Sequence, residues 1–178
     1  MIDNVDIFIC VKSYYSFLIT VVNKYQNFDI FIDDGSTDGS LEVLTRLQTQ
    51  HDSIVVIEFR RNFGQTAALA AGLRCAKGET VVTMDADRQN DPRDIEILLN
   101  EIDDGKDLAC GWRYNRQDGL WLRLLPSRAA NWLISMTTDV KLHDYGCTLK
   151  AMRKDVAKNL RLYGERHRFI PAIASWYG

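Results

Sequence analysis

Short apolar runs alternate with segments of helical period along the first 113 residues. The apolar runs are rich in β-branched residues and predict strands at residues 5–11, 29–32, 54–59, 80–84 and 107–112. The segments between them predict helices at residues 13–25, from Leu41 onward, at 67–76 and from Pro92 onward. Because alternation of strand and helix is typical of right-handed βαβ units, the chain predicts an α/β fold with a mostly parallel sheet flanked by helices.

Two helix boundaries carry recognisable signals. Asp91 and Pro92 suit the N-cap and the first position of the fourth predicted helix, and Gly78 suits the stop of the third. After Arg113 the alternation ends. A helical period covers residues 120–136, one more strand of either direction is predicted within 145–152, and a terminal helix is predicted at 166–176, which Pro171 must kink or split.

Composition narrows the class of protein. The chain has 178 residues, of which 46% are hydrophobic and 26% charged, and this is enough for one globular core. A net charge of -2 provides no overall field that would attract nucleic acid. The four cysteines form no CxxC pair, so a reducing compartment is favoured over a disulfide framework or a zinc site. No run approaches the ~18 apolar residues that a membrane span needs.

Two carboxylates, Asp85 and Asp87, follow the fourth predicted strand at the point where it ends. Open α/β sheets bind ligands beyond the carboxyl ends of their strands. Hard oxygen ligands a few residues apart suit a divalent cation that keeps several waters and bridges to substrate phosphates. A bare Asp-x-Asp is more often a solvated loop that caps the next helix, so the neighbouring strands have to decide between the two interpretations.

The neighbouring predicted strands also end in polar sequence. Asp33 and Asp34 follow the second strand, Arg61 and Asn62 the third, and Arg113 the fifth. Carboxylates and arginines at one edge suit a metal-bound diphosphate, because arginine binds phosphate oxygens in a bidentate manner. One of the two aspartates could accept hydrogen bonds from a base or ribose. The alternatives are that Asp33 and Asp34 shape the turn and cap the next helix, and that Arg113 is a surface arginine.

Four motifs occur in a specific order and spacing, although each alone is a weak signal. They are Asp33-Asp34-Gly35-Ser36-Thr37-Asp38-Gly39-Ser40, Arg61-Asn62-Phe63-Gly64-Gln65-Thr66-Ala67-Ala68, Asp85-Ala86-Asp87-Arg88-Gln89 and His143-Asp144-Tyr145-Gly146-Cys147. With them the chain, from about residue 29 to its end, resembles the family 2 glycosyltransferases of the GT-A fold. Within that family it resembles the polyprenyl-phosphate glycosyltransferases, which include dolichol-phosphate mannose synthases and bactoprenol glucosyl transferases.

The resemblance implies an inverting transfer of a sugar from a nucleotide-sugar, expected to be a UDP-sugar, to a polyprenyl phosphate. Mg2+ or Mn2+ would be held by Asp85, Asp87 and Gln89. Arg113 and Arg128 would face phosphates of donor or acceptor, and Asp144 would be the catalytic residue near the reacting centre. The residues implied in nucleotide-sugar binding are Asp33, Asp34, Ser36, Asn62, Gly64, Asp85, Ala86 and Asp87.

Two departures from the family pattern keep alternatives open. Family members usually follow the first strand with Pro-x-x-Asn-Glu, whereas the matching place here reads Cys10-Val11-Lys12-Ser13-Tyr14-Tyr15. Relatives also usually continue into membrane helices, so we expect residues 1–178 to be a single GT-A catalytic domain truncated before that region. The alternatives are a GT-A transferase acting on a saccharide hydroxyl in polysaccharide synthesis, and an inactive nucleotide- or lipid-binding fragment.

The location follows from the acceptor that the resemblance implies. A lipid phosphate requires the site to reach a bilayer surface. The stretch Leu120-Trp121-Leu122-Arg123-Leu124-Leu125 mixes apolar, aromatic and basic residues, as interfacial segments do, although an ordinary core helix has the same pattern. We therefore expect a cytoplasmic protein that is peripheral at the inner face of the membrane.

Overall fold

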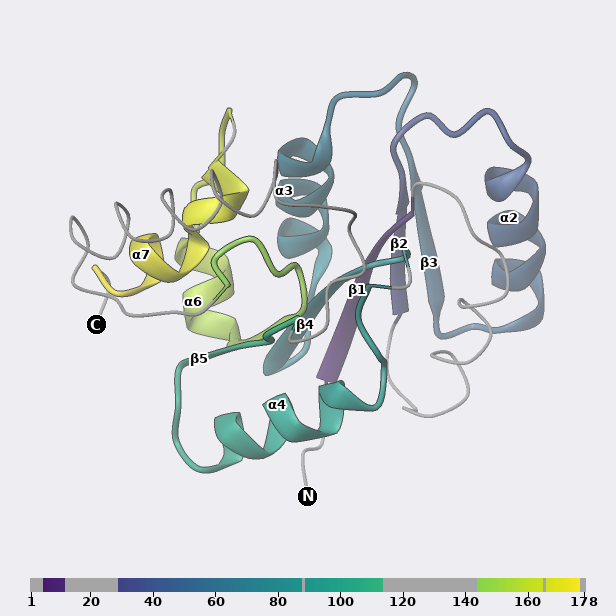
Figure 1. The fold of residues 1–178 in the computed structure, drawn as a ribbon. Helices are drawn as coiled ribbons and strands as arrows, with labels where there is room; N and C mark the ends of the chain where they lie inside the picture. Colours follow the sequence, from purple (N-terminus) through teal and green to yellow (C-terminus); the bar gives the residue numbers. More distant parts are fainter. Residues whose placement is uncertain (1–4, 12–28, 88, 114–143, 165, 177–178) are drawn as a thin grey trace.

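Six strands form one sheet in the order β3-β2-β1-β4-β6-β5 (Figure 1). The computed structural model describes residues 5–11, 29–87, 89–113, 144–164 and 166–176. Parallel pairing joins β1 (Val5–Val11), β2 (Asp29–Asp33), β3 (Ile54–Glu58) and β4 (Thr80–Asp85). The strand β6 (Lys150–Arg153) pairs antiparallel with both β4 and β5 (Leu108–Cys110). The predicted α/β class with a mostly parallel sheet is confirmed.

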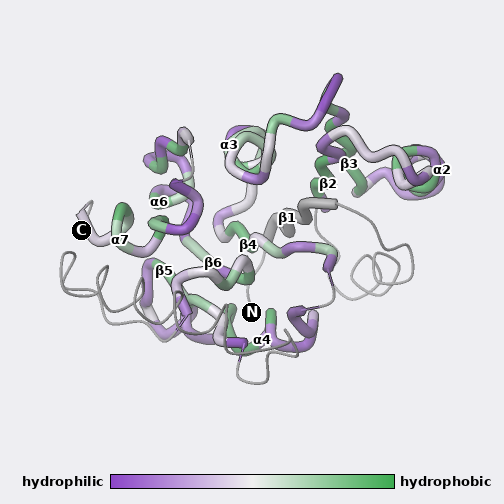
Figure 2. Tube along the Cα trace, turned by 45° about the horizontal axis from the view of Figure 1, so that its top comes forward, coloured by the Kyte–Doolittle hydropathy of each residue, from purple (hydrophilic) through white to green (hydrophobic). Residues whose placement is uncertain are grey.

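Helices cover both faces of this sheet. One face packs against α2 (Ser40–Gln50) and α4 (Asp94–Asp103), and the other against α3 (Gln65–Cys75), α6 (Lys154–Asn159), a 3-10 turn η1 (Arg166–Phe169) and α7 (Ile170–Ala174). Figure 2 shows α4 and α3 on opposite sides of β4. The sheet is therefore the middle of three layers.

The sheet separates two hydrophobic cores, and the side chains of its buried strands contribute to both. Phe31 in β2 faces Leu44 and Ile95, whereas its neighbours Ile30 and Ile32 lie in the second core with α3. This division follows because successive side chains of a strand point to opposite faces. β2 is buried along its whole length, as expected for a strand covered on both sides. The polar residues that end such strands are thereby fixed at the sheet edge.

Two helix boundaries differ from the prediction. The helix after the two carboxylates begins at Asp94 instead of Pro92. The Asp91 carboxylate accepts a hydrogen bond from the main-chain nitrogen of Arg93, and its carbonyl accepts one from Asp94, so residues 91–94 form a turn before the helix starts. The helix α3 ends at Cys75 with Ala76 as its C-cap, so Gly78 is not its stop.

The last part of the chain was predicted less completely. Pro171 lies in the first turn of α7, after η1, so the predicted terminal helix is split. The short helix α6 was not predicted. The helices predicted at 13–25 and 120–136, and with them Trp121 and Leu122, lie outside the described residues. In the described part of the chain, no helix combines the length and the apolar character required to cross a bilayer.

Candidate functional site

The polar strand ends meet at one edge of the sheet. Asp33 pairs with Val11 at the end of β1, and Asp85 pairs with the preceding residue, Cys10. The two aspartates therefore lie one strand away from β1 on either side. β5 also ends at this edge, and because β6 runs in the opposite direction it begins there, at Lys150.

Asp33 and Asp34 have different roles in the fold. The Asp34 carboxylate accepts hydrogen bonds from the main-chain nitrogens of Phe63 (2.7 Å) and Gly64 (2.9 Å), which ties the β2 loop to the β3 loop. Asp33 is 1% exposed, and its Oδ2 accepts a 3.2 Å hydrogen bond from the Ser36 nitrogen. Within the described residues its buried Oδ1 has no hydrogen-bond partner. Asp33 is thus the member of the pair that keeps a carboxylate oxygen without a hydrogen-bond partner among the described residues.

The loops that follow β2 and β3 pack closely against each other, and they contain the other predicted residues, Ser36, Asn62 and Gly64. Gly35 has φ 75°, and a Cβ there would lie 2.8 Å from the Asn62 nitrogen, so only glycine fits. The main-chain nitrogens of Ser36 and Gly64 are engaged by Asp33 and Asp34. The two carboxylates therefore fix the backbone of both loops.

Asp85 ends β4 with its carboxylate held from the side. Gln65, the first residue of α3, donates a 2.7 Å hydrogen bond from Nε2 to Asp85 Oδ2. Burial, followed by the negative charge of Asp87, raises the pKa of Asp85 to about 6. Asp87 is exposed, and its Oδ1 accepts a 3.0 Å hydrogen bond from the Gln89 nitrogen. Ala86 between them is 2% exposed, so it offers almost no surface to a ligand.

Asp85 and Asp87 fit a divalent cation whose other ligands would be waters and phosphate oxygens. Burial raises the pKa of Asp85 most, and a cation between the two carboxylates would offset the second cause, the negative charge of Asp87. The described residues contain no group of three or more His, Cys, Asp or Glu that could enclose a metal. Two carboxylates with waters and phosphate oxygens form the coordination that Mg2+ adopts in such sites. The donor set therefore suits Mg2+ or Mn2+ bound with a phosphorylated ligand.

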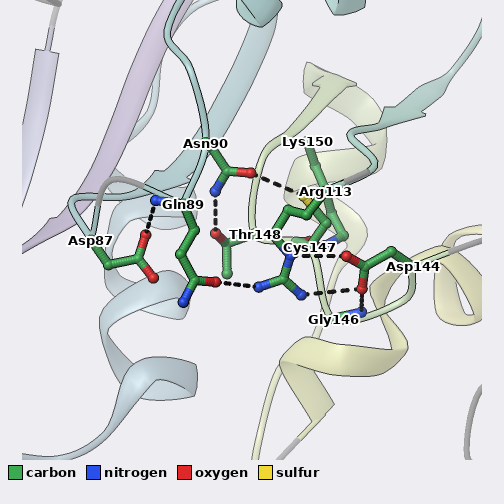
Figure 3. Close-up of polar contacts among 9 residues, drawn as sticks. All are labelled: Asp87, Gln89, Asn90, Arg113, Asp144, Gly146, Cys147, Thr148 and Lys150. Atoms are coloured by element: carbon green, nitrogen blue, oxygen red, sulfur yellow. Dashed lines mark hydrogen bonds and ion pairs between the residues drawn. The ribbon is translucent and has the colours of Figure 1, made fainter. Parts of the chain in front are cut away.

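Arg113 and Asp144 form a mostly buried ion pair beside Asp87 and Gln89 (Figure 3). Arg113 donates from Nε to Asp144 Oδ2 (2.8 Å) and from Nη2 to Oδ1 (3.1 Å), and the two side chains are 11% and 8% exposed. Nη1 donates to Gln89 Oε1 at 2.7 Å. Arg113 is therefore no ordinary surface arginine, and the amide oxygen of Gln89 faces Arg113. Arg128, the other predicted phosphate ligand, lies outside the described residues.

Sequence reasoning missed several residues that support the site. Asn90 is buried, donates to Thr148 Oγ1 (3.3 Å) and accepts from the Cys147 thiol (3.2 Å), which joins the loop after β4 to the loop before β6. Lys150 and Gln65 line a cavity of about 20 Å³ together with Asp85, which is room for one water molecule. A charged residue inside the apolar run 149–152 was the available signal for Lys150.

The three-layer architecture around a mostly parallel sheet is that of a GT-A glycosyltransferase fold. The glycosyl transferase family 2 model matches residues 9–161, and the chain belongs to this family. A dodecaprenyl-phosphate galacturonate synthase from Rhizobium johnstonii is 51% identical over 146 residues, covering 80% of this chain and 43% of the relative. An undecaprenyl-phosphate 4-deoxy-4-formamido-L-arabinose transferase from Pseudomonas aeruginosa is 39% identical over 149 residues, covering 83% and 44%. The predicted resemblance to polyprenyl-phosphate glycosyltransferases is confirmed, and the chain spans less than half the length of these relatives.

Solved structures agree on the fold. A mycobacterial protein superposes with a TM-score of 0.71 at 17% identity, covering 98% of this chain and 61% of that one. Glucosyl-3-phosphoglycerate synthase from Mycobacterium tuberculosis, solved with Mn2+ and UDP-glucose, has a TM-score of 0.66 at 16% identity, covering 89% and 59%. At these identities the similarity shows the GT-A fold, as predicted.

Proposed function

We propose that this chain is the catalytic domain of an inverting, metal-dependent glycosyltransferase that moves a sugar from a nucleotide-sugar to a polyprenyl phosphate. The observation that carries the proposal is the position of the Arg113–Asp144 pair beside Asp85 and Asp87 at the ligand-binding edge. An arginine held by two of its nitrogens is preorganised to bind phosphate oxygens. The names of the two relatives, which both contain a polyprenyl phosphate, support the same acceptor class.

The donor half of the site comes from the parallel strands. Asp33 Oδ1 is an acceptor suited to a base N–H, such as that of uracil. The backbone around Ser36, Asn62 and Gly64 would line the nucleoside, with Asp34 holding these loops in place. Asp85 and Asp87 would hold Mg2+ or Mn2+, with Gln89 near it. A divalent cation neutralises the charge of a departing diphosphate.

The acceptor half depends on positioning more than on proton removal. A phosphate monoester has a second pKa of about 6 and is mostly dianionic at pH 7, so it needs no general base. The Asp144 carboxylate already accepts two hydrogen bonds from Arg113 and one from the Gly146 nitrogen (3.0 Å). We therefore propose that Asp144 acts by orienting Arg113, with Arg128 as a further phosphate ligand.

The rival acceptor, a saccharide hydroxyl, would need a base worth ~10² to 10⁴ in rate. Since Asp144 is engaged with Arg113, the contacts favour the phosphate acceptor. We further propose that the protein works at the cytoplasmic face of a membrane, where a lipid phosphate is accessible. The segment at residues 120–125 would contribute the interfacial contact.

Calorimetry with UDP, with and without Mn2+, tests the donor half of the proposal. Metal-dependent binding is expected, and a titration without heat under both conditions would favour an inactive fragment. A thermal-shift screen of nucleotide-sugars then identifies the donor. Transfer of radiolabelled sugar to a short-chain polyprenyl phosphate tests the acceptor half, and transfer only to a saccharide would favour the rival acceptor.

A further inference from the structure

Lys150 is a buried lysine behind the turn that carries Asp144. It begins β6, is 3% exposed, and its Nζ donates a hydrogen bond to the carbonyl of Cys147. Within the described residues no carboxylate oxygen lies within ion-pair distance of this ammonium. Burial lowers the pKa of Lys150, as expected for a cation removed from water. A buried charge of this kind is costly to the fold, so it calls for an explanation.

The hydrogen bond from Lys150 is one of three that hold successive main-chain carbonyls after Asp144, those of Cys147, Thr148 and Leu149. Thr83 Oγ1 donates to the carbonyl of Thr148 at 2.8 Å, and the Gly111 nitrogen donates to the carbonyl of Leu149 at 2.8 Å. Neutral groups therefore fix two of three successive carbonyls, and a lysine is used only for the one nearest to Asp144. Its position beside the ion pair distinguishes it from the other two donors (Figure 3).

The charge of Lys150 acts on the groups around it. Its ammonium group interacts electrostatically with four neighbouring ionisable groups, which are the Cys110 and Cys147 thiols, Asp144 and Arg113. Its charge also acts on Asp85 across the cavity that both side chains line. The carboxylate of Asp144 therefore lies between the side chains of Arg113, with which it forms an ion pair, and Lys150.

We propose that Lys150 is a positioning residue for sugar transfer: it holds the turn at residues 144–147 so that Asp144 presents Arg113 to an anionic ligand. The identity of that ligand rests on the proposed function, whereas the effect of Lys150 on Arg113 does not. The inference therefore has two separate tests, of which the first needs no substrate.

The first test follows the Nε–H of Arg113 by 15N NMR, with the signal assigned by its loss in Arg113→Gln. In the parent this proton should exchange slowly, because it is bonded to Asp144. Lys150→Met has a similar volume and no charge, and the signal should become that of a free arginine. If Lys150→Met does not fold, Lys150→Gln is used instead. The side-chain nitrogen of glutamine lies one bond short of the lysine Nζ position, so it does not reach the Cys147 carbonyl. A folded variant that keeps the Arg113 signal of the parent would overturn the inference.

Lys158 provides a matched control. Its Nζ also donates to main-chain carbonyls, those of Leu73, Arg74 and Ala76, at the opposite end of α3 from Gln65. Lys158→Met should leave the Arg113 signal unchanged. If both lysine variants lose that signal, loosening of the whole domain is the cause and a specific role of Lys150 is excluded.

The second test is kinetic. Lys150→Met should weaken acceptor use about 10- to 100-fold in kcat/KM, because misplacement of a binding group has effects of this size. The affinity for UDP without metal should stay at the parent value. Loss of a buried ammonium and loss of its hydrogen bond to the Cys147 carbonyl change stability in opposite directions, so urea unfolding is measured only to show that the variant is folded. Parent-like kcat/KM in an active protein would contradict the inference. An inactive parent would contradict only the proposed function, since the NMR result stands by itself.

Discussion

Gln65 holds Asp85 across the junction of α3 and β4, through a 2.7 Å hydrogen bond from its side-chain amide to Oδ2. This bond favours the ionised carboxylate and opposes the burial that raises its pKa to about 6. Gln65→Leu should therefore raise the pKa of Asp85 further. 13C NMR titration of the carboxyl carbon measures this shift, and an unchanged or lower pKa in the variant would contradict the assigned contact. Metal-dependent UDP binding at pH 6 should weaken more than at pH 8.

Asp85→Asn should separate stability from binding. An unfolded aspartate has a pKa of about 3.9, whereas folded Asp85 has a pKa of about 6, so the native state binds more protons in between. Its contribution to stability therefore decreases as pH rises through this window, by about 3 kcal/mol. Urea unfolding at pH 7 should show the variant to be as stable as the parent or more so. Calorimetry should show that its metal-dependent UDP binding is lost.

Asp87→Asn is expected to give the same loss of metal-dependent binding with little effect on the fold, because this side chain is exposed. Calorimetry with UDP and Mn2+ measures it, and UDP without metal serves as the control. Equal affinity of variant and parent in the presence of Mn2+ would remove Asp87 from the metal site.

The neighbouring aspartates should respond in opposite ways. Asp34→Asn replaces an acceptor of two main-chain N–H groups, so it should lower the free energy of unfolding by about 1–3 kcal/mol. Asp33→Asn can keep its bond to Ser36 and places an amide where Oδ1 has no partner, so stability should change little. The UDP affinity of Asp33→Asn should fall about tenfold or more. Urea denaturation measures the stability of both variants and calorimetry measures their UDP affinity. The reverse pattern would make Asp33 the structural residue and Asp34 the ligand-binding one.

Asp144→Asn should lower turnover substantially, because the bidentate grip on Arg113 is lost. The pH–rate profile should nevertheless keep an inflection near the acceptor's own second pKa of about 6. If the parent's inflection disappears in the variant, Asp144 is a general base, and the saccharide hydroxyl becomes the better acceptor.

Membrane contact stays a prediction from the sequence. Weak binding to anionic liposomes is expected, and Trp121→Ala combined with Leu122→Ser should reduce it. Sedimentation with vesicles measures the bound fraction, and neutral vesicles control for charge. Binding that is unaffected by the pair of substitutions would leave the core-helix interpretation of this segment.

The sequence predicted the layers and the ligand edge because both depend on local signals. Buried parallel strands are short apolar runs, and the polar residues after them are visible in the chain. The individual roles of Asp33 and Asp34 could not be predicted, since they depend on the Phe63 and Gly64 nitrogens about 30 residues further along. The start of α4 was misplaced because Asp91 can cap either a helix or a turn.

Lys150 and Asn90 were missed for a related reason. The partners of Asn90 lie 57 and 58 residues further along, in a loop that comes close only when β6 inserts between β4 and β5. The hydrogen-bond partner of Lys150 is local, but the burial of Lys150 depends on the same insertion. A lysine in an apolar run was visible, but the sequence contains nothing that distinguishes an edge lysine from a buried one. Arg113 was found by its place after a strand, whereas its bond to Asp144 spans 31 residues.

The reversed direction of β6 has a consequence for how this protein can diversify. Asp33 and Asp85 follow strands of the parallel array, whereas Asp144 precedes an antiparallel strand and meets Arg113 from the adjoining one. The two halves of the site thus belong to separate, contiguous stretches of chain. Exchange of residues 111–149 between relatives should therefore transfer the acceptor preference of the donor protein, while the nucleotide requirement stays that of the recipient. Cys110 and Lys150 are suitable junctions for such chimaeras, because β5 ends at the first and β6 begins at the second.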